Sequence, residues 1–202
     1  MPAYIFGMLA GIIALGIYVP YAIDILKGRV LPARSTRIML TLVLIIIVLQ
    51  QHELDSGWAL GVTIGELVGS LAILGLSLPR GIGGSFKSDL VCYALLVAAV
   101  CAWLLVDNPL LALHLSIVAD FIAFTPTLIK SWYMPKSETA LFYVGGVVSA
   151  MLGAMAASSF VYSVVVFPLY LAAVNGLQLV IMYRVRFIKK FIITRRSEPD
   201  IS

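Results

Sequence analysis

Two acidic residues, Glu66 and Asp120, stand near the middle of long apolar runs, where carboxyl groups are rare. A carboxylate at that depth in a membrane costs about 2.5–3.5 kcal/mol on insertion scales, and such residues usually face a cavity and serve a function. No lysine or arginine shares their depth in these runs, so burial favours the protonated form. We therefore expect two carboxyls that exchange a proton or bind a cationic solute. The alternative is a protonated acid that only hydrogen-bonds in a helix contact.

Three further polar or aromatic side chains are candidates for lining the cavity that the two carboxyls are expected to face. Asn175 and Gln178 are three residues apart, so they share one face of a helix. Tyr18 lies half a turn before Pro20 and is placed to line the cavity as well. We expect these side chains to bind the solute or the proton. Alternatively, the two amides only tie helices together, at about 0.6 kcal/mol per hydrogen bond, and Tyr18 only packs.

Two prolines inside apolar runs predict points of bending. Pro20 and Pro126 each remove one hydrogen bond from a helix, which kinks it. We expect them to be hinges, with static kinks as the alternative. Asp24 and Lys130 lie a short distance after the two prolines, at the ends of the runs. They are candidates for an ion pair that gates one end of the cavity, unless each is a solvated interface residue.

The elements that position these residues are membrane-spanning helices, because 61% of the 202 residues are hydrophobic and 12% are charged. Soluble domains have about 45–50% apolar and about 25% charged residues. Seven runs are long enough to cross a bilayer core, which takes about 20 apolar residues. We expect them at 3–26, 36–50, 57–78, 89–106, 109–132, 138–157 and 159–184.

The positions of the basic residues predict how these helices are oriented. All 14 lysines and arginines fall after the first, third, fifth or seventh run, so seven spans put every one of them on the same side. The positive-inside rule makes that side cytoplasmic. We therefore expect an integral membrane protein with its N-terminus outside and its C-terminus in the cytoplasm. The net charge of +4 is then a record of topology, and nucleic acid is not expected as a partner.

An internal repeat relates the first and fifth runs. Residues 18–27 followed by Arg34-Ser35-Thr36 resemble residues 124–133 followed by Lys136-Ser137-Glu138, with a proline in each about two turns before a short basic loop. Two similar copies predict two three-helix units in the same orientation, joined by the fourth helix, which is a known transporter architecture. Two unrelated prolines with similar loops are the alternative. The predicted divisions are 1–78, 79–106 for the loop and linker helix, 107–184, and a basic tail at 185–202.

These two motifs resemble the PQ-loop repeat, and the whole arrangement resembles the PQ-loop/SWEET transporter superfamily. The residue after the proline, a glutamine in the family, is Tyr21 in one copy and Thr127 in the other. The resemblance implies a central pocket between two three-helix bundles, and it implies a substrate contact for Asn175. It leaves the transported solute open, because members of the family carry sugars, amino acids and other small solutes. The prolines that sugar transporters carry in spans two and six are absent here, which argues against a sugar.

A small-solute transporter working by alternating access is the function that we expect, with proton coupling left open by the two carboxyls. The alternative is a seven-helix receptor or sorting protein that binds without transport. A retinal protein is excluded, because residues 159–184 contain no lysine for a Schiff base. The chain has no nucleophile–base pair and no metal-ligand spacing, so we expect no enzyme, no cofactor and no metal. The expected partners are the lipid bilayer and a small molecule.

One helix also carries a pattern typical of close helix packing. Gly61, Gly65 and Gly69 are spaced four apart on one face. Small residues at this spacing let another helix backbone approach closely. The pattern leaves a homo-oligomer open, with the glycines at its interface.

Overall fold

The computed structural model describes residues 2–30, 32, 34–81, 86–135, 138–157 and 161–196. Within these ranges the protein is all-α, without a strand. Its elements are α1 (Ala3–Gly16), α2 (Tyr18–Leu26), α3 (Arg34–Glu53), η1 (Gly57–Ala59), α4 (Leu60–Arg80), α5 (Phe86–Val106), α6 (Pro109–Tyr133), α7 (Ala140–Met155) and α8 (Tyr162–Arg196). Lys136 and Ser137 of the second motif, and the predicted break at Ser158, lie outside the described residues.

Most helices agree with the predicted runs to within a few residues, but α8 continues to Arg196, twelve residues beyond the predicted end at 184 and into the stretch predicted as a basic tail. Local chemistry explains several of the other ends. Gly28 has a φ of 66°, which lets the chain turn after α2. Asn108 caps α6, because its side-chain oxygen accepts a hydrogen bond of 3.0 Å from the Leu111 amide. Pro109 follows as the first residue of α6, where its missing N–H costs nothing.

Five segments are long and apolar enough to cross a membrane: Ala3–Leu26, Arg34–Glu53, Gly57–Arg80, Pro109–Tyr133 and Tyr162–Arg184. Two shorter apolar helices, Tyr93–Leu105 and Ala140–Met155, stand at the two other predicted spans. With 16 residues, α7 is about 24 Å long, less than the roughly 30 Å of a bilayer core.

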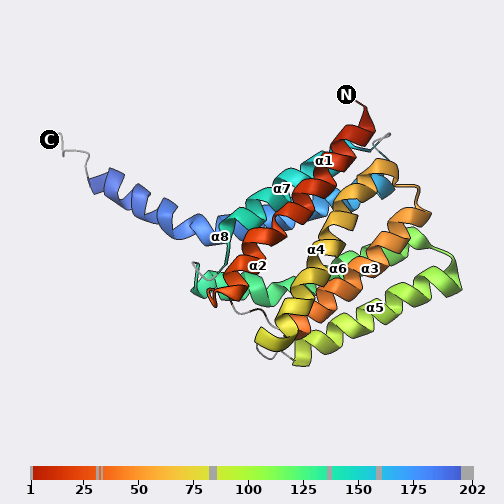
Figure 1. Ribbon diagram of the computed structural model, residues 1–202, viewed down its shortest axis with the longest axis horizontal. Coiled ribbons are helices and arrows are strands. Elements are labelled where there is room, and N and C mark those ends of the chain that lie inside the picture. Colours follow the sequence, from red (N-terminus) through yellow and green to blue (C-terminus); the bar gives the residue numbers. More distant parts are fainter. Residues whose placement is uncertain are drawn as a thin grey trace.

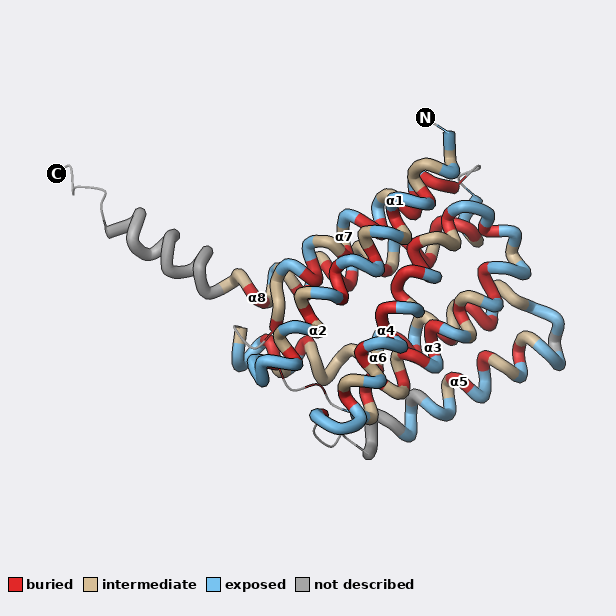
Figure 2. Tube along the Cα trace, viewed as in Figure 1, coloured by how far each residue is buried: buried red, intermediate tan, exposed pale blue. Residues whose placement is uncertain are grey.

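Large apolar side chains cover much of the outer surface. Ile12, Leu105 and Val180 are 63%, 80% and 66% exposed. Figure 2 shows buried positions on the inward faces of the helices and exposed positions on the outward faces. Continuous apolar surface of this extent is unusual for a protein in water. Together with the long apolar helices, it indicates a membrane-embedded protein.

Each helix has a small set of main packing partners. The α1 helix packs on α4 and α7, and α3 packs on α4 and α6. The α8 helix packs on α7 and α6, while α5 packs mainly on α6. In Figure 1, α5 accordingly lies at one edge of the bundle. The same figure shows α2, α4 and α6 ending, and α3 and α7 beginning, at the lower left end of the bundle.

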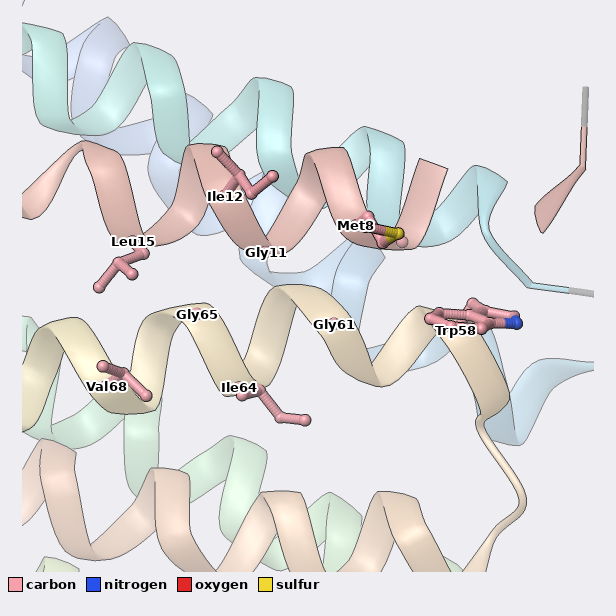
Figure 3. Close-up of a pocket in the computed structure, with 10 residues that line it drawn as sticks. Met8, Gly11, Ile12, Leu15, Trp58, Gly61, Ile64, Gly65 and Val68 are labelled. Carbon is pink, nitrogen blue, oxygen red and sulfur yellow. The ribbon is translucent and has the colours of Figure 1, made fainter. Parts of the chain in front are cut away.

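The predicted glycine contact is made inside the chain, between α4 and α1. A Cβ on Gly11 would lie 2.8 Å from the Gly61 carbonyl oxygen, and one on Gly61 would collide with the Gly7 carbonyl. Gly65 faces Gly11 in the same way, and Figure 3 shows the two helices side by side. The glycines are therefore occupied by an internal contact, and the suggestion that they form an oligomer interface is wrong for this face.

Candidate functional site

A cavity of about 60 Å³ lies between the helices and brings together most of the polar residues of the apolar runs. Both carboxyls, one guanidinium and one amide share its lining with aromatic and aliphatic side chains. The lining residues are Arg37, Leu40 and Leu44 of α3, Glu66 of α4, Asp120 and Phe124 of α6, Phe142 and Tyr143 of α7, and Leu171, Val174 and Asn175 of α8. The cavity is therefore the candidate functional site.

Glu66 reaches the cavity from the buried face of α4. The side chains of Thr63 and Ser70 share this face and bond to α3, with Thr63 donating to Gln51 at 2.5 Å and Ser70 lying 2.8 Å from the Thr41 hydroxyl. These contacts fix the orientation of α4 about its axis relative to α3, so that the Glu66 side chain points into the bundle. Its carboxyl accepts a hydrogen bond of 2.6 Å from the phenol of Tyr18.

Asp120 reaches the same cavity from α6. Its carboxyl accepts a hydrogen bond of 2.6 Å from the phenol of Tyr170, a residue of α8. Both predicted carboxyls are thus buried, share one cavity and hold a tyrosine from another helix. Nothing in the sequence pattern singled out Tyr170, because a tyrosine in an apolar helix is common.

Tyr18 lies behind Glu66 and is not among the lining residues of the cavity. Its ring meets the ring of Phe142 edge to face, with 4.9 Å between the centroids. The residue therefore acts on the site through its hydrogen bond to Glu66. The prediction that it lines the cavity directly is wrong.

The two amides of α8 have different surroundings. Asn175 lines the cavity, and its side-chain nitrogen donates to the Leu171 carbonyl at 2.8 Å. Gly146 makes room for it, since a Cβ there would lie 2.8 Å from the Asn175 side chain. Gln178 is one turn further on, outside the lining, and donates to the Ser131 hydroxyl of α6 at 2.5 Å. Gln178 thus joins two helices, as the alternative reading of the amides expected.

Arg37 is the cavity residue that the sequence reasoning missed. Its charge assigned it to the basic loop after the first span, and the acids were expected to have no basic residue at their depth. That expectation is wrong, because Arg37 lines the same cavity and is only 9% exposed. The signal was present in the spacing: Arg37, Thr41 and Leu44 are at i, i+4 and i+7, which makes one buried helix face.

The predicted ion pair between Asp24 and Lys130 is absent from the described residues. Asp24 pairs with Arg29 at 3.3 Å and accepts a hydrogen bond of 2.6 Å from Thr139. Lys130 pairs with Glu138 instead. The reason is that the two residues before α7 lie against α2 and α6 and supply each of them with a partner. The ends of α2 and α6 are therefore held by the same short segment.

The two prolines differ in their local effect. The helix breaks at Ile17, between α1 and α2, next to the Gly16 carbonyl that would have accepted from residue 20. Pro20 has no N–H to donate there, which explains the position of the break. Pro126 lies inside α6, and the helix continues through it.

A second, larger hollow lies on the outer surface. It is a groove of about 330 Å³ over the glycine contact of α1 and α4. Figure 3 shows its walls, formed by Met8, Ile12, Leu15, Trp58, Ile64 and Val68. The groove is larger than the cavity, but its lining offers almost only carbon atoms. A polar solute would find no partner there, so the cavity remains the candidate site.

Comparisons of the chain with family models, with curated proteins and with solved structures each found no match. Among the residues that the structure describes, no group of three His, Cys, Asp or Glu side chains could hold a metal ion. The chemistry of the cavity follows from the side chains that line it. The cavity offers two hydrogen-bonded carboxyls, a guanidinium and an amide around a small space between the helices.

Proposed function

We propose that this protein transports a small solute across a membrane by alternating access, with the cavity as its binding site. The observation that carries the proposal is the meeting of Glu66, Asp120, Arg37 and Asn175 in one cavity inside an apolar bundle. Ionisable groups are costly at membrane depth and mark solute or proton pathways where they line a cavity. Binding sites of transporters lie between helical repeats near the membrane midplane.

The proposal includes the repeat of two three-helix units, α1–α4 and α6–α8, with α5 as the linker. What supports it is the pattern of packing partners. The α1 helix packs on α4 in its own unit and on α7 in the other, and α6 packs on α8 and on α3 in the corresponding way. The lining of the cavity shows the same correspondence between the units. Leu40 follows Ser35 at the same distance in sequence as Phe142 follows Ser137, so the two residues occupy matching repeat positions, and both line the cavity.

The size of the cavity supports a conformational change as part of the cycle. Pockets for small molecules usually measure about 300–1,000 Å³, whereas this cavity measures about 60 Å³. It has room for a few water molecules, so a solute enters only after the helices move apart. We propose that α2 and α6 separate from the segment before α7, where Asp24 meets Thr139 and Lys130 meets Glu138.

The proposal further assigns seven spans, a cytoplasmic C-terminus and membership of the PQ-loop/SWEET superfamily, and it assigns no enzymatic activity.

The alternative is a receptor that binds the same solute without moving it. Flux into liposomes distinguishes the two. Purified protein should move at least one member of a solute panel, and Glu66→Gln or Asp120→Asn should reduce that flux by at least about tenfold, since each removes an ionisable group from the site. Binding without flux would favour the receptor, and unchanged flux in both variants would refute the role of the carboxyls.

A further inference from the structure

Arg37 is a buried cation with no carboxylate within ion-pair distance among the described residues, although Glu138 lies near enough to interact with its charge. Its guanidinium donates to the phenol oxygen of Tyr21 at 2.5 Å and lies over the ring of the same residue, 4.9 Å from its centroid. A phenol and a ring face solvate the charge but do not neutralise it. Glu138, on the neighbouring α7 end, is already paired with Lys130 and does not line the cavity.

Neither cavity carboxyl neutralises Arg37 directly. Glu66 and Asp120 each accept a hydrogen bond from a tyrosine, and neither lies within ion-pair distance of a basic residue in the part of the chain that the structure describes. Glu66 and Glu138 act on the Arg37 charge only from beyond ion-pair distance. A buried charge without a direct partner is costly. The cavity therefore presents a cation that an arriving anion would stabilise, next to groups that accept hydrogen bonds.

We propose that the cavity binds a small organic carboxylate, with the carboxylate group on Arg37. The inference rests on the proposed function in taking the cavity as the solute site, but it does not require transport. A guanidinium presents donors in a rigid planar fork that matches the two oxygens of a carboxylate. An amino group on the solute would find acceptors in Glu66, Asp120 and the Asn175 side-chain oxygen, all of which line the same space.

Binding of four matched probes to the protein in lipid nanodiscs tests the proposal. Propionate and propionamide have the same shape and differ in the charge that Arg37 would recognise. Alanine and alaninamide make the same comparison with an amino group present. We expect each carboxylate to bind at least about tenfold more tightly than its amide, since a charged hydrogen bond contributes about 1.5–3 kcal/mol.

Three variants assign the effect to Arg37. Arg37→Gln should weaken binding of the carboxylates by roughly 10- to 100-fold and leave binding of the amides unchanged. Arg37→Lys should fall between, because an ammonium keeps the charge and loses the fork. Arg34→Gln is the matched control, since Arg34 is exposed on the same helix and does not line the cavity.

Tyr21→Phe separates solute binding from a merely structural role. It removes the phenol that Arg37 contacts and keeps the ring. If Arg37 served only to hold Tyr21, this variant would weaken binding as much as Arg37→Gln does. Comparison of propionate with propionamide on the unchanged protein decides the question even where Arg37→Gln does not fold.

The proposal is overturned if the amides bind as tightly as the carboxylates, if Arg37→Gln keeps full affinity, or if none of the four probes binds to folded protein. Flux of a neutral solute without carboxylate binding would reject this inference and keep the transporter. Carboxylate binding that depends on Arg37, without flux, would keep this inference and reject the transporter.

Discussion

Each carboxyl of the cavity is held by a tyrosine from another helix. Tyr18 of α2 donates to Glu66 of α4, and Tyr170 of α8 donates to Asp120 of α6, both at 2.6 Å. The acid lies in the third helix of one proposed unit and in the first helix of the other. The same two helices of each unit are therefore joined by the same chemistry, which fixes the position of each acid beside the cavity.

Removing either phenol should destabilise the protein. Tyr18→Phe and Tyr170→Phe each delete a donor to a buried carboxyl, and leaving such a group unsatisfied costs about 1–3 kcal/mol. The effect should be larger for Tyr18, which is 6% exposed, than for the half-buried Tyr170. Unfolding in mixed micelles with increasing SDS measures the change. Tyr93→Phe on the exposed face of α5 is the control, and equal stability of all three variants would contradict the prediction.

Much of this site could be predicted from the sequence, because Glu66, Asp120 and Asn175 are polar residues at depths where lipid tolerates few of them. Arg37 could not be placed by the same rule. It begins in the first turn of α3, where charge alone indicates the interface, and its long side chain then reaches the cavity. The position of a residue along an apolar run predicts the depth of its α-carbon in the membrane. It does not predict how far a long side chain such as that of Arg37 reaches from there.

At the scale of elements, the contact between α1 and α4 depends on the absence of side chains. The Gly11 and Gly65 backbones meet without a Cβ between them, and the Tyr18 ring occupies the space beside Gly69. The same ring donates to Glu66 through its hydroxyl. Close approach of these two helices is therefore linked to the position of the cavity carboxyl.

Adding one methyl group to this contact should separate the helices. In Gly11→Ala the new Cβ would lie 2.8 Å from the Gly61 carbonyl oxygen, so backbone must move, at a cost of about 1–3 kcal/mol. Gly75→Ala is a matched control in α4, because a Cβ there meets nothing within 4 Å. That variant should be neutral or more stable by up to about 1 kcal/mol, given the higher helix propensity of alanine. Equal loss of stability in the two variants would refute the argument.

Most limits of the helices could be predicted, with the break at Ile17 and the end of α8 at Arg196 as exceptions, whereas the packing partners of the helices could not. Runs of apolar residues end at charges and turn residues, so Asn108 and Pro109 mark the start of α6 in both the sequence and the structure. The glycines of α4 predicted close packing but carried no information on which helix would approach. Gly7 and Gly11 of α1 match their spacing, and only the structure identifies that match.

For the whole molecule, the ends of the bundle differ in charge. Lys27, Arg29 and Lys130 lie where α2 and α6 end, and Arg34 begins α3 at the same end. At the opposite end, Glu53 is the last residue of α3, and Asp55 lies in the turn that follows. The charge asymmetry expected from the positions of all basic residues is thus present in space among the described residues. Which end faces the cytoplasm depends on the membrane and on no contact within the protein.

Labelling of single cysteines in intact cells decides the orientation. In a variant with Cys92 and Cys101 replaced by serine, Lys27→Cys places an exposed thiol directly after α2, and Glu53→Cys places one on the last residue of α3. Because basic residues are retained in the cytoplasm, a membrane-impermeant maleimide should label Glu53→Cys from outside and label Lys27→Cys only after permeabilisation. The labelled fraction after detergent provides the control for reactivity. Labelling of Lys27→Cys from outside and of Glu53→Cys only after permeabilisation would show the opposite orientation. Labelling of both from outside would mean that α3 does not cross the membrane.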